Sequence, residues 1–388
     1  MALLYLNSPY IVSAQSNDND GLKSCRIELW IYEGQKDSFN QAEPTFTLRS
    51  TALSPFEPIY VDIAGVCSDY IETNYTGLYQ TDSIWVSYRK VGVFVNGATE
   101  YLIGNEEQQI NTLAGVDGYK FYEENLQRAG SGNDDLLMST NTIRIPKGDN
   151  FKIPVYAGGV SSVSFYADGE YYYTESVPES NFSAEQIKYI DSRGGDISEY
   201  LSKVAYLGLT FEENKCKKDL CYSPFSESPD KVVIGLRNGT SKTIKVEREA
   251  ENLYEVVKLT FLSRYGVLRD LFFFKKSSKS LSVSRQEYTA NTTKHIYETG
   301  SITKHQFNTY DIVGEEKETL NSGYVPESLN DDFRELLLSS KVWITKDKQI
   351  LPVNIENSSM QYKTHLNDKL INYQIEAKYS YKKINRTR

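Results

Sequence analysis

The sequence has few of the residues that carry most enzyme chemistry. Its 388 residues include three histidines and four cysteines. A hydrolytic triad needs a positioned base, which is usually histidine, but His295, His305 and His365 stand singly among polar neighbours, as surface histidines do. The Gly-x-Ser-x-Gly elbow, the Walker loop and the Gly-x-Gly-x-x-Gly fingerprint are also absent. We therefore predict that the chain is not an enzyme and that it uses no cofactor.

Metal-binding patterns are incomplete. Cys216 and Cys221 have a spacing that zinc ligands use, but a second half of the site is missing, and Cys25 and Cys67 stand alone. Residues 17–21 have the composition of a calcium loop, yet no register fits an EF-hand. We predict a reduced loop and a solvated turn here, with zinc and calcium as the alternatives.

Paired carboxylates raise the alternative of a glycosidase, because two carboxyl groups flanking the scissile bond are what that reaction needs. Such pairs occur at 123–124, 134–135 and 331–332. Carboxylates are common in this chain, and their pairing in space is not a property of the sequence. We therefore give this alternative little weight.

Long apolar runs and excess positive charge are lacking too. No run approaches the ~18 residues that span a bilayer, and the first residues show no charged, apolar signal segment, so we expect synthesis in the cytoplasm and no membrane anchor. The net charge is −9, which argues against nucleic acid as a partner. The basic residues concentrate at the end of the chain, where we expect a solvated tail or a contact to an acidic neighbouring subunit: Lys378, Lys382, Lys383, Arg386 and Arg388.

Aromatic residues are abundant instead. The 30 tyrosines and 16 phenylalanines, together with many Ser, Asn and Thr, favour β structure over a helical bundle. Tyrosine buries a ring while its hydroxyl stays in water, which suits half-exposed strands and contact surfaces. We predict a mainly β fold of the α+β kind, built of antiparallel β-sandwich modules with a few short helices.

The length exceeds the ~250–300 residues at which single cores stop growing, so we expect several domains. The first, residues 1–90, combines strands at 24–32, 46–48 and 84–88 with a helix over 62–75, where apolar residues recur every three or four positions. The second, residues 91–258, is an antiparallel β region. It has strands at 91–95 and 141–145, a glycine-rich surface loop at 129–135, and short helices at 183–191 and 196–203.

Two dipeptides in this middle region predict tight hairpins. Asp168-Gly169 and Asn238-Gly239 each lie between apolar runs, and such pairs supply the positive φ that two-residue hairpin turns require.

The third domain, residues 259–388, is predicted to be a β module. A turn at 264–266 separates two strands, a helix with one apolar stripe spans 326–340, and 342–355 form a hairpin. The closing strand alternates, with Tyr373, Ile375, Ala377 and Tyr379 on one face. We name the aromatic residues of this module as candidate interface residues: Tyr265, Phe272, Phe273, Phe274, Trp343, Tyr373, Tyr379 and Tyr381.

Both ends of the chain resemble a family of virion structural proteins of tailed bacteriophages. The resemblance rests on Tyr265-Gly266 with Leu271-Phe272-Phe273-Phe274, on 319–324, 336–344, 352–355, 362–364 and 367–373, and on 7–9 and 59–75 near the start. The middle of the chain carries no such resemblance.

The resemblance implies a tail or baseplate subunit, located in the virion, that forms a ring with copies of itself and contacts neighbouring tail proteins. Two alternatives stay open: a host-attachment module that binds surface glycan, and a neck or head–tail connector protein.

Overall fold

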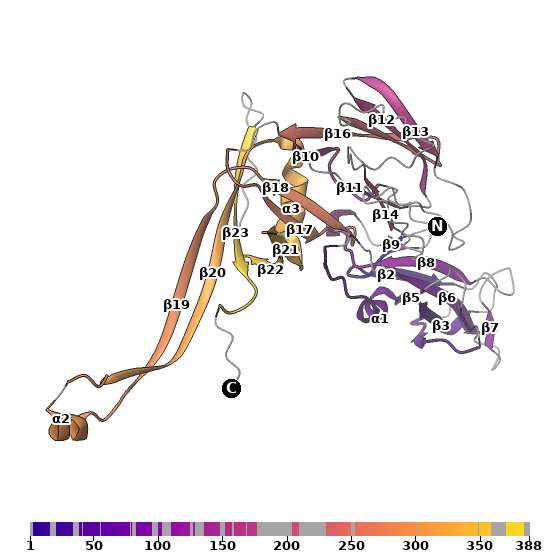
Figure 1. The fold of residues 1–388 in the computed structure, drawn as a ribbon. Helices are drawn as coiled ribbons and strands as arrows, with labels where there is room; N and C mark the ends of the chain where they lie inside the picture. Colours follow the sequence, from indigo (N-terminus) through magenta and orange to yellow (C-terminus); the bar gives the residue numbers. More distant parts are fainter. Residues whose placement is uncertain are drawn as a thin grey trace. The chain divides into compact units, whose positions relative to one another are not determined.

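The computed structural model is mostly β-strand and divides into two compact units, residues 1–250 with 261–270, and residues 251–260 with 271–388 (Figure 1). The mainly β fold class is therefore confirmed. The structure describes residues 3–15, 21–33, 39–40, 42–54, 56–77, 79, 83–94, 100–102, 110–124, 127–128, 136–147, 152–156, 159–167, 169–176, 204–208, 230–249, 253–300, 302–347, 349–357 and 370–383.

The first unit begins with a six-stranded sheet in the order β1-β8-β6-β3-β4, with β7 paired to β6. Its pairs are antiparallel except for β1 with β8. The strands are β1 (Leu3–Tyr5), β3 (Leu22–Tyr32), β4 (Phe46–Thr51), β6 (Ser83–Phe94), β7 (Glu100–Leu102) and β8 (Asn111–Val116). Because β6 runs through the expected domain boundary at residue 90, this sheet draws on both sides of it.

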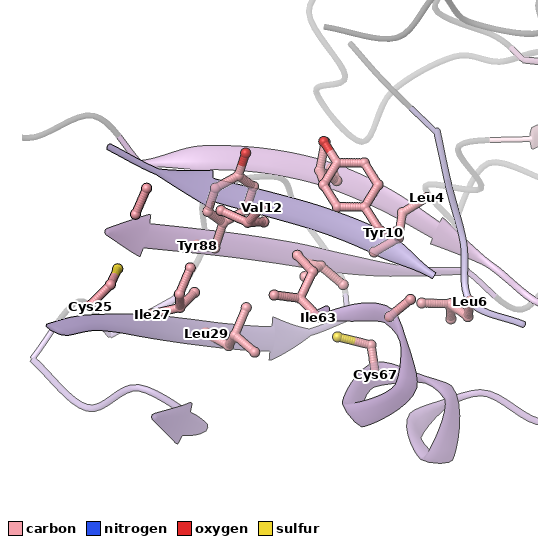
Figure 2. Packing of buried hydrophobic residues seen from close by; sticks show 14 of the residues in the cluster. Leu4, Leu6, Tyr10, Val12, Cys25, Ile27, Leu29, Ile63, Cys67 and Tyr88 are labelled. Atoms are coloured by element: carbon pink, nitrogen blue, oxygen red, sulfur yellow. The ribbon is translucent and has the colours of Figure 1, made fainter. Parts of the chain in front are cut away.

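A second, three-stranded sheet of the order β5-β2-β9 supplies the other half of the hydrophobic core. Figure 2 shows Tyr10 and Val12 of this sheet beside Ile27 and Leu29 of β3 in one cluster, with Cys67 next to them. The elements are β2 (Tyr10–Ala14), β5 (Ile59–Asp62), β9 (Gln127–Arg128), α1 (Ala64–Cys67), η1 (Ser68–Tyr70) and η2 (Tyr122–Glu124).

The helix predicted over 62–75 is much shorter than expected. It comprises only α1 and η1, because Ile71 is already extended, with φ −130° and ψ 130°. From Ile71 to Tyr75 burial alternates, with Thr73 and Tyr75 inside, which is the period of a strand rather than of a helix.

The rest of the first unit holds a five-stranded sheet, β10-β16-β15-β12-β13, and a separate β11-β14 pair. Both predicted hairpins are confirmed: β12 pairs with β13 around Gly169, and β15 pairs with β16 around Gly239, with φ +81° and +83°. The strands are β10 (Thr142–Pro146), β11 (Lys152–Tyr156), β12 (Val160–Ala167), β13 (Glu170–Ser176), β14 (Val204–Gly208), β15 (Lys231–Leu236) and β16 (Ser241–Glu249).

These sheets are not purely antiparallel, since β10 pairs in parallel with β16 and β9 with β2. The expected loop at 129–135 and the expected helices at 183–191 and 196–203 lie outside the described residues, as do Cys216, Cys221 and His365.

The second unit is organised by a seven-stranded sheet, β18-β17-β21-β22-β23-β20-β19, although the ends of β17 and β18 that fall within residues 261–270 are assigned to the first unit. The predicted closing strand is confirmed as β23, and its even-numbered residues Asn372, Gln374 and Glu376 are exposed while Tyr373 and Ile375 are buried. The elements are β17 (Val257–Leu262), β18 (Leu268–Phe273), β19 (Ser278–Thr289), α2 (Thr293–Thr299), β20 (Phe307–Pro326), η4 (Glu327–Leu329), α3 (Asn330–Leu338), β21 (Val342–Lys346), β22 (Gln349–Ile355) and β23 (Leu370–Tyr379).

The helix predicted over 326–340 corresponds to η4 followed by α3. Its apolar stripe faces the sheet, because Phe333 contacts Phe273 of β18 and Tyr373 of β23, with ring centroids 6.2 Å and 4.4 Å apart. This packing covers one face of the second unit's sheet.

Candidate functional site

The candidate interface aromatics are mostly internal to a single chain. Phe273, Phe274, Tyr379, Tyr265, Tyr373 and Trp343 are buried, and Phe272 is half-buried beside Phe274. Phe273 of β18 and Tyr373 of β23 pack against Phe333 of α3, and the Tyr379 hydroxyl of β23 donates to the buried Glu318. Tyr381, which follows β23 and contacts the ring of Tyr379, is the exposed member of the set.

The candidate catalytic and metal residues are scattered. His295 lies in α2 and His305 shortly before β20, whereas Glu124 pairs with Arg264 in the first unit and Asp332 is buried in α3. The described residues contain no cluster of three or more His, Cys, Asp or Glu side chains that could hold a metal ion. No helix in the described ranges combines the length and hydropathy that crossing a bilayer requires.

A two-stranded arm is the most conspicuous exposed feature of the second unit. β19 pairs with β20 along its whole length, whereas β23 pairs only with the Lys317–Pro326 part of β20. Residues 281–316, which include α2, therefore extend beyond the rest of the sheet, as Figure 1 shows. We call this segment the arm.

The arm exposes apolar side chains along its length. The exposed fraction is 58% for Leu281 on β19, 90% for Tyr297 on α2 and 86% for Ile302, and every residue of β19 is exposed. Monomeric proteins seldom expose contiguous apolar surface without a binding role. The large exposed hydrophobic residues of the arm are Leu281, Val283, Tyr288, Ile296, Tyr297, Ile302, Phe307 and Tyr310.

The base of the arm is held by a buried carboxylate. Glu318 on β20 is fully buried and accepts hydrogen bonds from the Tyr379 hydroxyl at 3.0 Å and from Lys346 Nζ at 3.1 Å. Burial, with Glu318 as the next cause, raises the pKa of Tyr379. Burial alone would lower the pKa of Lys346, but the contact with Glu318 raises it instead.

Two lysines of the expected basic tail pair with the arm instead of standing in solvent alone. Lys378 Nζ lies 2.7 Å from Glu315, and Lys383 Nζ lies 2.7 Å from Glu316. The Lys383 N–H also donates to the carbonyl of Gly314 at 3.0 Å. These contacts fix the point where β20 leaves β23 and continues into the arm.

The sequence signal for the arm is the Ser-Leu-Ser-Val-Ser alternation at 280–284, together with a second run from Phe307 to Val313 that contains several residues common in strands.

Comparison of the sequence with protein-family models and with curated proteins finds no match.

Proposed function

We propose that the chain is a structural subunit of a bacteriophage tail or baseplate, which assembles with copies of itself and with neighbouring tail proteins through the arm. The resemblance of both ends of the sequence to virion proteins motivates the phage assignment. The arm is the observation that carries the assembly role.

The physical argument concerns the stability of the arm. A two-stranded hairpin on its own is at best marginally stable in water, and the arm adds exposed rings and aliphatic side chains that lose contact with water only in a complex. When the same surface of two copies meets across a two-fold axis, each copy contributes the same patch, so one such arm per copy is sufficient to build a closed assembly.

The test compares the full chain with a variant whose arm is shortened. Replacing residues 284–313 with Asn-Gly joins Val283 to Gly314, which face each other in the β19–β20 ladder, and leaves the β20–β23 pairing in place. We expect light scattering to give a multiple of the 44.3 kDa chain mass for the full protein and the monomer mass for the variant, with an unchanged far-ultraviolet circular dichroism melt.

Mass spectrometry of purified phage particles is the second part of the test. The chain should be found in intact particles at more than one copy. A full-length protein that stays monomeric at high concentration and is missing from particles would overturn the proposal.

A glycan-binding role is the second candidate, because Tyr288, Tyr297 and Tyr310 offer exposed aromatic faces on the same arm. Tyr297→Ala would then reduce adsorption of particles to host cells without changing the assembled mass. Unchanged adsorption removes this candidate.

A further inference from the structure

We propose that the free edge of β19 pairs with β19 of a second copy of this chain, antiparallel and across a two-fold axis at Val283. The inference deepens the proposed assembly role and rests on it. It assigns the contacting strand, the register and the partner.

The first step is that β19 has an open edge. It is the last strand of the seven-stranded sheet, it spans 12 residues, and β20 is its pairing partner within the described part of the chain. Natural sheets protect such edges with proline, bulges, short strands or charged side chains. β19 does carry charges, at Lys279, Arg285 and Glu287, and the register proposed below pairs Lys279 with Glu287. β19 contains no proline. The one irregularity of the β19–β20 ladder lies on β20, where the pairing register skips Tyr310, so β19 itself stays regular from Ser278 to Glu287.

The second step identifies which residues face the open edge. Gly314 gives its carbonyl to the Lys383 N–H, on the side away from β19. In an antiparallel ladder the two members of a pair point their backbone groups either toward each other or away from each other. Val283, the partner of Gly314, therefore points its N–H and C=O outward, and so do the alternate residues Lys279, Leu281, Arg285 and Glu287.

The third step is the register. Pairing two copies through outward-facing residues requires that odd-numbered residues oppose odd-numbered residues. A centre at Ser282 would place Lys279 against Arg285, and a centre at Arg285 would place two arginines together, which is unfavourable. A centre at Val283 places Lys279 against Glu287 on both sides of the axis and pairs residues 278–288.

In this register the side chains also match. Val283 meets its own copy, Leu281 meets the methylene stem of Arg285, and the opposite face brings serines together, with Ser282 opposite Ser284. The exposed fractions of Leu281 and Val283, 58% and 42%, fall when the second strand is added. The partner is thus this same strand, because the charge pattern of β19 is complementary to itself when read in the reverse direction.

Disulfide trapping tests the register directly. Residues directly opposite each other in a hydrogen-bonded antiparallel pair have Cα atoms about 5.5 Å apart, which suits a disulfide. The full-length Val283→Cys variant, oxidised with oxidised glutathione, should form a covalent dimer, and peptide mass spectrometry should place the link at position 283.

Leu281→Cys is the matched control, because it changes an exposed residue of the same strand and the same face. In the proposed register the two copies of residue 281 are four positions out of line, so about 13 Å apart along the strand, and no link should form between them. Equal cross-linking of both variants would overturn the register.

A charge reversal gives a second, non-covalent readout. Glu287 is exposed and accepts a hydrogen bond from the Thr309 hydroxyl at 3.3 Å, so we expect Glu287→Lys to keep the fold while it opposes lysine to Lys279. We expect the dimer dissociation constant in sedimentation equilibrium to rise about tenfold, since two favourable cross-strand pairs become unfavourable. An unchanged constant counts against the pairing.

Failure of this inference is separable from failure of the proposed function. If the full chain associates and enters particles, but Val283→Cys forms no selective link, the edge pairing is wrong and the assembly role stands. If Val283→Cys links to a different protein or to another segment, the occupant is not a second β19. If the pairing of β19 with β19 is correct, any closed assembly that uses this contact contains an even number of copies, because a two-fold contact joins the copies in pairs.

Discussion

At the scale of single residues, two glycines allow the backbone of 261–270 to lie against the turn at 117–119. The Tyr119 N–H donates to the carbonyl of Arg264 at 2.7 Å. A Cβ added to Gly118 would lie 2.5 Å from that same carbonyl oxygen, and one added to Gly266 would lie 2.8 Å from the backbone of Asp117. Gly266 also has φ +70°, which side chains rarely adopt.

Gly266→Ala should therefore destabilise the first unit by about 2–5 kcal/mol, from the left-handed backbone and from overlap with neighbouring atoms. Gly239→Ala is the matched control, because its φ is +83° but no atom lies within 4 Å of the added Cβ; we expect a loss of about 1–2 kcal/mol. The midpoints of urea unfolding curves measure the loss of stability in both variants. Equal losses would show that the close backbone approach is not important.

The two cysteines of the first core should be unreactive in the native protein. Burial raises the pKa of the Cys25 thiol to about 11 and that of Cys67 to about 12, so neither forms the thiolate that reacts. At pH 8, labelling with iodoacetamide followed by peptide mass spectrometry should find both unlabelled until urea unfolds the chain. Labelling of either at the rate of a free thiol would contradict this expectation.

The same shifts set the response to alkali. Because the thiols ionise near pH 9 when unfolded and only near 11 and 12 when folded, the unfolded state loses these protons first. The stability they contribute is complete below pH 9 and is lost as the pH rises through 11 and 12. Cys25→Ala and Cys67→Ala together should flatten this part of the stability profile.

At the scale of elements, strands with one buried face were predictable and the arm was not. β15 and β23 show alternating burial in the structure, and the sequence shows the same alternation. The part of β20 at the base of the arm carries Gly314-Glu315-Glu316-Lys317, a composition that argues against a strand. This segment is a strand because it pairs with β19 and because its glutamates form ion pairs with Lys378 and Lys383, which are more than sixty positions away in the sequence.

The same reasoning explains the candidate site. Aromatic residues in alternating strands were predicted as interface residues, but alternation is the pattern of a face that the chain itself covers. The alternation at 280–284 indicates a strand, but both faces of β19 are exposed, so the pattern alone does not place Leu281 on an arm. Its place there becomes visible only when the partner strands are known.

Removal of residues 373–388 should unfold the second unit. β23 lies between β22 and β20 in the sheet, so its loss separates four strands from two and exposes the face that Phe333 covers. We expect the calorimetric transition of this unit to disappear. A chain ending at Lys383 is the control and should retain it; persistence of the transition in the shorter chain would refute the expectation.

The buried carboxylate joins several strands of the same sheet. Glu318→Ala removes the acceptor for Tyr379 and the nearer partner of Lys346, and we expect a loss of about 3–5 kcal/mol, as for other buried pairs broken on one side. The double variant Glu318→Leu with Lys346→Met should lose clearly less, because no buried charge remains. Urea unfolding midpoints distinguish the single variant from the double variant. Equal losses of stability would mean that the buried charge of Lys346 is not destabilising without Glu318.

At the scale of the whole molecule, net charge opposes self-association at neutral pH. The chain carries −9 at pH 7 and has a sequence pI of about 5.2, so copies repel one another and less so as the pH falls. We expect the dissociation constant from sedimentation equilibrium to decrease between pH 8 and pH 6. At 1 M salt, where charges are screened within about 3 Å, this dependence should vanish; its persistence would point to specific titrating contacts.

The ten residues 261–270 belong to the first unit, while the chain on both sides of them belongs to the second. No single cut can therefore release either unit whole: a fragment ending at residue 250 lacks the carbonyl that Tyr119 binds and the Asp270 carboxylate that Tyr79 binds. A recombination event with one crossover cannot exchange either unit intact, so the two units should be inherited together as one genetic module.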